Sequence, residues 1–154
     1  MSELRIGQYC VTIKSQIAEG GFGLIYLVVD RQSRELVLKK CAIQRQESYD
    51  IVKKEIFMLQ RYANPYIVKL LASEILQQRG SSDALLLLEM CPGGHLLERL
   101  NSRNGQPLPI ASIYRIFGQI LLALRPMHEN VPPITHRDIK LENILFGSVS
   151  FEYI

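Results

Sequence analysis

The hydrophobic periodicity of the chain changes once, at residues 91–94, and this change limits the possible folds more than any other feature of the sequence. Before it, short apolar segments are separated by glycine and polar turns, which is typical of β-strands. After it, apolar residues recur at the spacing of α-helices. We therefore predict an α+β fold in which a strand-rich part precedes a helical part, with Pro92-Gly93-Gly94 near the junction.

The strand-rich part is predicted to contain five strands and one helix. The strands cover residues 11–17, 24–29, 35–42, 67–76 and 84–90. A glycine turn at residues 20–23 joins the first two as a hairpin, and the helix covers residues 49–62 until Asn64-Pro65 stops it. The last strand is nearly all leucine, so we expect it to be buried on both faces. The polar residues 77–83 before it are expected to form a loop.

The helical part is predicted to contain a short helix at residues 95–103 and a long one at residues 110–128. The long helix carries one apolar stripe, formed by Ile110, Ile113, Phe117, Ile120, Leu121 and Leu124. Tyr114, Leu122 and Ala123 widen this stripe beyond what a surface helix needs. We therefore expect the helix to be buried on more than one side.

Composition indicates a globular, intracellular protein. A chain of 154 residues is long enough to form one hydrophobic core, and a content of 47% hydrophobic and 21% charged residues is typical of a globular protein. The net charge of +3 is spread among acids without a basic block, so no nucleic-acid partner and no membrane insertion are predicted. Cys10, Cys41 and Cys91 form no metal-binding or paired motif, which favours free thiols in a reducing compartment. With no apolar segment behind positive charge at the N-terminus, we predict a cytoplasmic location, with the nucleus as the alternative.

The glycine turn reads Ala18-Glu19-Gly20-Gly21-Phe22-Gly23 and carries the last two glycines of a phosphate-covering loop, with Ala18 in place of the first. Glycines in such a loop let backbone N–H groups approach phosphate oxygens, which a side chain would prevent. From the glycines alone, a plain hairpin turn is an equally good explanation.

Lys39 lies on the third predicted strand, and Glu55 lies sixteen residues later in the predicted helix. A lysine on that strand can hold nucleotide phosphates if a carboxylate on the helix keeps its ammonium pointed inward. Two unrelated solvated charges are the alternative, and nearby Lys40, Lys53 and Lys54 show how common charge is in this region.

The most informative segment is His136-Arg137-Asp138-Ile139-Lys140-Leu141-Glu142-Asn143, which matches the H-R-D-L-x-x-x-N catalytic loop with isoleucine for leucine. Phosphoryl transfer requires positioned groups that orient the nucleophile and neutralise charge. Asp138 would orient the substrate hydroxyl, Lys140 would stabilise the transferring phosphoryl group, and Asn143 would ligate magnesium. The alternative, a basic loop after a helix, explains this ordered set of residues poorly.

From residue 6 to residue 146 the chain resembles eukaryotic protein kinases, and within them the numb-associated family, which includes adaptor-associated, cyclin-G-associated and yeast actin-regulating kinases. The family likeness rests on Ile17-Ala18-Glu19-Gly20-Gly21-Phe22-Gly23, Lys54-Glu55-Ile56, Cys91-x-Gly93-Gly94 and Pro133-Ile134-x-His136-Arg137-Asp138. The resemblance implies a five-stranded antiparallel N-lobe with one helix at residues 1–90. It also implies a hinge and partial helical C-lobe at residues 91–146, followed by a divergent tail at residues 147–154.

The resemblance further implies ATP and Mg²⁺ as cofactors and a protein substrate as partner. Leu88 would be the gatekeeper, the backbone of Glu89 and Cys91 would bind adenine, and an apolar set would enclose the ring, namely Ile25, Val37 and Leu145. Core packing is the alternative for each apolar residue. Lys140 is what serine/threonine kinases carry, and the family is associated with endocytic adaptors and membrane traffic.

The sequence departs from the kinase pattern at its end, because it contains no Asp-Phe-Gly. The missing aspartate would hold the metal that bridges the β- and γ-phosphates, so we expect this partial domain to be inactive alone. Two readings remain: a serine/threonine kinase represented by a fragment, or a non-catalytic truncated isoform that binds nucleotide or competes for partners.

Overall fold

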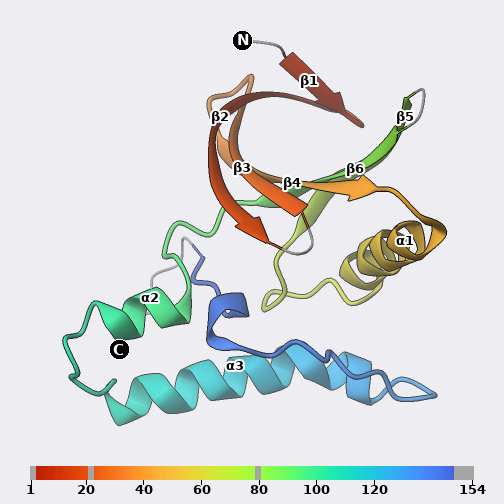
Figure 1. The fold of residues 1–154 in the computed structure, drawn as a ribbon. Helices are drawn as coiled ribbons and strands as arrows, with labels where there is room; N and C mark the ends of the chain where they lie inside the picture. The colour runs from red at the N-terminus through yellow and green to blue at the C-terminus, as the bar shows by residue number, and fades with distance from the viewer. Residues whose placement is uncertain (1–2, 21–22, 79–80, 148–154) are drawn as a thin grey trace. The chain divides into compact units, whose positions relative to one another are not determined.

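The computed structural model describes residues 3–20, 23–78 and 81–147, and it divides into two compact units (Figure 1). The first unit contains the chain up to Ala63 together with Ile67–Met90. The second unit contains Asn64–Tyr66 and the chain from Cys91 onward. Among the described residues, no helix is both long enough and apolar enough to cross a membrane.

The first unit is a curved antiparallel sheet of six strands in the order β1-β2-β3-β4-β6-β5, accompanied by one helix (Figure 1). Its elements are β1 (Glu3–Ile6), β2 (Tyr9–Gly20), β3 (Gly23–Asp30), β4 (Glu35–Ile43), α1 (Gln46–Arg61), β5 (Leu70–Gln78) and β6 (Ser81–Glu89). The helix contacts β4 and β5.

Strand β6 separates two hydrophobic clusters, because its consecutive side chains point to opposite faces of the sheet. Leu85 and Leu87 belong to one cluster, which also contains Val28 and Leu38. The other cluster contains Ala84, Leu86, Cys41 and Val52 and lies toward α1. Residues Ala84, Leu85, Leu86 and Leu87 are all at most 1% exposed, so the expected burial of this strand on both faces is confirmed.

The number of strands was predicted wrongly, because the sheet has six strands and not five. The additional strand, β1, forms a hairpin with β2 in which Ile6 pairs with Tyr9, and Gly7 adopts the left-handed conformation at φ +56° in the turn. Ile6 is fully buried. Four residues are too short for their alternation to stand out in the sequence, and the burial of Ile6 is what gives the strand its stability.

The predicted loop at residues 77–83 is too long at both ends. Gln77 pairs with Ser82 and Leu76 pairs with Asp83, so β5 and β6 extend into this range. Residues 79 and 80 lie outside the described residues. Backbone pairing between strands does not require apolar side chains, which explains why the polar composition was misleading. Helix α1 likewise begins at Gln46, three residues before its predicted start, and β5 begins at Leu70 and not at Ile67.

Buried Asp30 organises the turn between β3 and β4. Its Oδ1 accepts hydrogen bonds from the backbone N–H groups of Gln32 and Arg34 at 2.9 Å, and Nε of Arg34 donates to Oδ2 at 2.7 Å. Burial opposes ionisation of this carboxyl, but the bonds from Arg34 and Gln32 outweigh it and lower its pKa. The turn therefore carries an ionised, fully bonded carboxylate in its interior.

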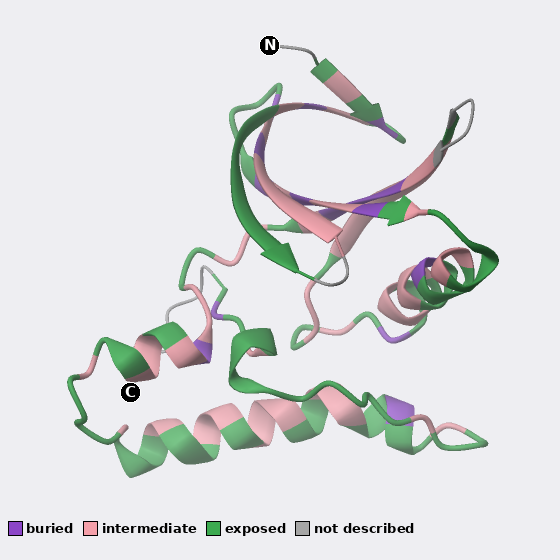
Figure 2. Ribbon diagram, viewed as in Figure 1, coloured by how far each residue is buried: buried purple, intermediate pink, exposed green. Residues whose placement is uncertain are grey.

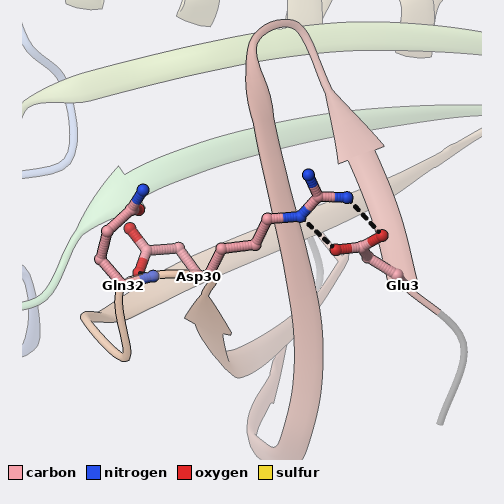
Figure 3. A network of polar contacts seen from close by, with 4 residues as sticks. Glu3, Asp30 and Gln32 are labelled. Carbon is pink, nitrogen blue, oxygen red and sulfur yellow. Dashed lines mark hydrogen bonds and ion pairs between the residues drawn. The ribbon is translucent and has the colours of Figure 1, made fainter.

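Arg31 in the same turn forms an ion pair with Glu3 of β1 (Figure 3). Its guanidinium donates to the two carboxylate oxygens of Glu3 at 2.8 and 2.9 Å. The hydrogen bond from Arg31 lowers the pKa of Glu3. In Figure 3, the carboxylate of Glu3 lies at one end of this contact, and Asp30 and Gln32 lie near its other end.

The second unit contains α2 (Leu96–Asn101), α3 (Ile110–His128) and a short 3-10 turn, η1 (Leu141–Asn143). The predicted bounds of the long helix are confirmed, and α2 lies within the range predicted for the short one. The expected burial of α3 on more than one side is not found in the described chain. Met127 is its buried residue, whereas Tyr114 is 72% and Phe117 61% exposed. Figure 2 shows most of α3 in the colours of exposed and intermediate residues.

Candidate functional site

Lys39 and Glu55 meet between β4 and α1. The Nζ atom of Lys39 lies 2.6 Å from Oε1 and 2.8 Å from Oε2 of Glu55. Leu38 points to the opposite face of β4 and is buried there, which turns Lys39 toward the helix. Val52 of α1 is buried in the cluster on that face, and this packing directs Glu55 toward the sheet. The structure therefore brings together the two charges that the sequence separates by sixteen positions.

The ion pair is only partly open to water, since the side chains of Lys39 and Glu55 are 16% and 32% exposed. Partial burial reduces solvent screening and makes the pairing stronger than a surface salt bridge. Cys41, two residues along β4, is buried close by. Burial raises the pKa of its thiol, the charge of Lys39 opposes this effect, and the charge of Glu55 adds to it.

A row of paired residues places the predicted nucleotide contacts of the first unit beside Lys39. Ala18 pairs with Ile25, and Ile25 pairs with Lys39. Val37 lies two residues from Lys39 on the same face and pairs with Leu88. Directly paired side chains share a face of an antiparallel sheet, so these residues form one surface, which is exposed at Ala18 and partly buried at the other positions.

The two described glycines of the glycine hairpin differ in how closely other residues approach them. Gly20 pairs with Gly23, and a Cβ on Gly20 would meet nothing within 4 Å. Gly23 has φ +129°, and a Cβ there would lie 2.2 Å from the carbonyl oxygen of Lys40. Gly23 is thus required by close packing on β4, whereas no described residue lies close to the Cβ position of Gly20. Gly21 and Phe22 lie outside the described residues.

Glu89, at the end of β6, is held by a reciprocal contact with Lys69. Its backbone N–H donates to the carbonyl oxygen of Lys69 at 3.0 Å, and its Oε1 accepts from the N–H of Lys69 at 2.7 Å. The N–H of Glu89 therefore already donates a hydrogen bond to Lys69. Any hydrogen bond between its backbone and adenine would have to be accepted by its carbonyl oxygen.

In the second unit, the glycine pair after Cys91 forms a short ribbon with the segment around Leu145. The N–H of Gly93 donates to the carbonyl of Phe146, and the N–H of Phe146 donates to the carbonyl of Gly94, both at 3.0 Å. A Cβ on Gly93 would lie 2.5 Å from the Cβ of Phe146. The sequence indicated this glycine pair but not the reason for each glycine: Gly93 allows Phe146 to approach, whereas Gly94 adopts the left-handed conformation with φ +68°.

The catalytic-loop residues converge in the second unit on Asp138. Nδ2 of Asn143 donates to the carbonyl oxygen of Asp138 at 2.9 Å and to its Oδ2 at 2.7 Å, while Nζ of Lys140 lies 3.5 Å from Oδ1. The N–H of Asp138 donates to Nδ1 of His136 at 3.3 Å. The sequence analysis included His136 only as part of the motif. Its position two residues before Asp138 was the feature that could have predicted this hydrogen bond.

Arg137, between these groups, adopts the left-handed conformation with φ +67°. Such a conformation is uncommon for a residue with a side chain and is often found at functional sites. Its Nε donates to Oγ1 of Thr135 at 3.3 Å. The loop is thus held in a bent form that presents the carboxylate of Asp138, whose side chain is 52% exposed.

The described residues fit a magnesium ion in part. Asn143 uses its amide nitrogen on Asp138, which leaves its Oδ1 as an oxygen ligand, and Mg²⁺ prefers such ligands together with substrate phosphates and water. No group of three or more His, Cys, Asp or Glu side chains that could hold a metal occurs in the described residues. The roles of Asn143 and of the nucleotide-facing residues remain predictions.

Comparison with known proteins finds related sequences over most of the chain. A family model described as "Protein kinase domain" matches residues 11–151. Two probable serine/threonine-protein kinases of Dictyostelium discoideum are 38% and 35% identical, over 93% and 97% of this chain. A serine/threonine-protein kinase of Schizosaccharomyces pombe is 30% identical over 94% of it. The chain spans 18%, 14% and 15% of the lengths of these three relatives.

Proposed function

Because this chain belongs to the protein kinase domain family, we propose that it supplies the nucleotide-binding and catalytic-loop residues of a serine/threonine kinase. The reaction would transfer the γ-phosphoryl group of ATP to a serine or threonine hydroxyl of a protein. The observation that carries the proposal is that Lys39 with Glu55, and Asp138 with Asn143, each form the contacts that phosphoryl transfer requires.

Each residue contributes a defined interaction. Glu55 holds the ammonium of Lys39, which can then bind the negatively charged phosphates of ATP. Asp138, oriented by Asn143, accepts a hydrogen bond from the substrate hydroxyl and aligns it for attack. Lys140 places a positive charge beside this carboxylate and stabilises the transferring phosphoryl group. Oδ1 of Asn143 would hold magnesium in part, and the bound ion would neutralise phosphate charge.

A second candidate is a nucleotide-binding module without phosphoryl transfer. It is favoured because no group of three or more His, Cys, Asp or Glu side chains that could hold a metal occurs among the described residues. Under this alternative the surface formed by Ile25, Val37, Leu88 and Lys39 would still bind nucleotide, and the chain would act through its partners.

We also propose assignment to the numb-associated kinases, a cytoplasmic location and a role in endocytosis with endocytic adaptors as partners. The support is the sequence from Ile17 to Gly23, where Ala18 replaces the first glycine, together with the sequence from Pro133 to Asp138. Imaging of the tagged full-length protein beside a coated-pit marker tests this role. A distribution that never overlaps the marker would contradict it.

Titration with Mg-ATP, followed by calorimetry and thermal unfolding, tests the catalytic proposal. Ligand binding stabilises the folded chain by mass action, so the melting temperature should rise, and Lys39→Met should abolish the rise. Lys40→Met is the matched control, because Lys40 pairs with Asp83 at 3.0 Å instead of Glu55. Phosphate transfer to a serine peptide, lost in Asp138→Asn, supports the kinase; binding without transfer supports the second candidate. A folded chain that binds no nucleotide contradicts both.

A further inference from the structure

The connection between α2 and α3 in the second unit (Figure 1) contains a tight turn at Asn104-Gly105. Asn104 has φ +51° and Gly105 has φ +81°, and the N–H of Gln106 donates to the carbonyl oxygen of Arg103 at 3.0 Å. Two successive positive φ angles closed by such a bond are typical of a type I′ turn, in which Asn-Gly is a preferred pair. The guanidinium of Arg103 also donates to the carbonyl oxygens of Gln106 at 3.0 Å and Pro107 at 2.7 Å. The turn is therefore closed by its own residues.

Two neighbouring groups in this turn are left without partners. Asn104 and Gly105 are both exposed. Neither the side-chain amide of Asn104 nor the N–H of Gly105 forms a hydrogen bond with any residue that the structure describes. A Cβ on Gly105 would meet nothing within 4 Å, so no described side chain shields its nitrogen. The carboxamide of Asn104 and the next backbone nitrogen are thus both open to reaction.

At each other asparagine, one of these two groups is already used. Asn101 is followed by Ser102, whose N–H donates to the carbonyl oxygen of Glu98 at 2.9 Å. The other side-chain amides donate to carbonyl or carboxylate oxygens of described residues, at Asn64, Asn130 and Asn143. Asn104 is also the asparagine of the chain that precedes a glycine. Sequence and hydrogen bonding therefore distinguish the same residue.

We propose that Asn104 is a site of spontaneous deamidation in the folded chain. The backbone nitrogen of Gly105 attacks Cγ of Asn104 and forms a C–N bond, while the bond from Cγ to Nδ2 breaks and ammonia leaves with the proton of the attacking N–H. Water then opens the resulting five-membered succinimide at either carbonyl, which gives aspartate or isoaspartate. Glycine favours the attack because it has no Cβ to obstruct it. The reaction needs only solvent water and is independent of the proposed function.

The products differ in what they do to the turn. Both place a negative charge where the chain has a neutral amide, but isoaspartate also adds a methylene group to the main chain before Gly105. The lengthened main chain no longer fits the four-residue geometry in which Gln106 donates to Arg103. The isoaspartate form should therefore open the connection between α2 and α3, whereas the aspartate form should keep it closed.

The test is ageing of the whole chain at physiological temperature and mildly alkaline pH, followed by peptide mass spectrometry. We expect Asn104 to gain the mass difference between an acid and an amide at least about tenfold faster than Asn101. A synthetic peptide of residues 101–108 gives the rate without the fold, and the folded chain should react within about tenfold of it. Gly105→Ala should slow the reaction by about tenfold. Gly118→Ala, the same change at an open position of α3, is the matched control and should leave the rate unchanged.

Several results would overturn the proposal. Asn104 keeps its mass, or reacts no faster than Asn101, or reacts as fast in Gly105→Ala as in the parent chain. A folded chain that reacts far more slowly than the peptide would show that the turn protects the amide, which also overturns it. Circular dichroism verifies that each variant is folded.

Hydrogen exchange tests the opening of the turn. The N–H of Gln106 should exchange faster in the aged chain than in Asn104→Asp, because this variant carries the charge on an unaltered main chain. Equal exchange in the two samples would overturn this part of the proposal.

Discussion

One ammonium group, Nζ of Lys39, lies within 2.8 Å of both carboxylate oxygens of Glu55. The contact joins β4, the strand that would bind phosphate, to α1 across sixteen positions of the chain. Packing of Val52 and Ile56 against the sheet determines the position of Glu55. The charge pair therefore depends on the hydrophobic cluster beneath it.

Glu55→Gln should weaken Mg-ATP binding, because the amide keeps the shape of the carboxylate but loses the charge that orients Lys39. We expect an increase in Kd of about tenfold, measured by calorimetry. The pair is about one-sixth to one-third exposed, so we expect the free energy of unfolding to fall by only about 1 kcal/mol.

Glu47→Gln is the matched control for this change. Glu47 lies in the first turn of the same helix, and no ion pair involving it is found among the described residues. Its replacement should leave the Kd for Mg-ATP unchanged. Equal effects of the two substitutions would show that Glu55 has no special relation to the nucleotide.

Gly23→Ala should destabilise the first unit strongly. The new Cβ would lie 2.2 Å from the carbonyl oxygen of Lys40, and the backbone has φ +129°, which alanine rarely adopts. We expect a loss of about 3 kcal/mol, measured by urea unfolding. Gly20→Ala is the contrasting variant, since a Cβ there meets nothing within 4 Å, and it should change stability by less than about 1 kcal/mol.

Gly93→Ala should disrupt the ribbon of the second unit, because its Cβ would lie 2.5 Å from the Cβ and 2.9 Å from the carbonyl oxygen of Phe146. Hydrogen exchange should show faster exchange at the N–H groups of Phe146 and Leu96, which donate across the ribbon. Gly118→Ala, in α3 with open space around it, should instead stabilise the chain by up to about 1 kcal/mol. Unchanged exchange at Phe146 in the first variant would contradict this account.

Asp30 should make the stability of the first unit depend on acid pH. The folded-state pKa of Asp30 lies below its ordinary value of about 3.9, so its contribution is complete above that value and is lost as the pH falls through the folded pKa. Urea unfolding at a series of pH values should show this loss, and Asp30→Asn should reduce it. The same pH dependence in both chains would show that the bonds from Arg34 do not stabilise the ionised form.

Periodicity and motif spacing were sufficient for much of the fold. Residues 110–128 form α3 as predicted, and residues 84–87 are buried on both faces of the sheet. These features depend on local patterns of apolar residues, which a sequence displays directly. The contact between Lys39 and Glu55 was also foreseeable, because it combines a strand lysine with a helix carboxylate in a known arrangement.

By itself, the sequence determined the order of the elements after the first strand, the kinase-type catalytic loop around Asp138 and the candidate partner of Lys39. Only the tertiary structure decided that Glu3–Ile6 becomes a sixth strand and that Gly23 and Gly93 are required by close backbone contacts. Each of these depends on distances between residues far apart in the chain. Such distances follow from how strands and helices pack, and no local pattern of side chains records them.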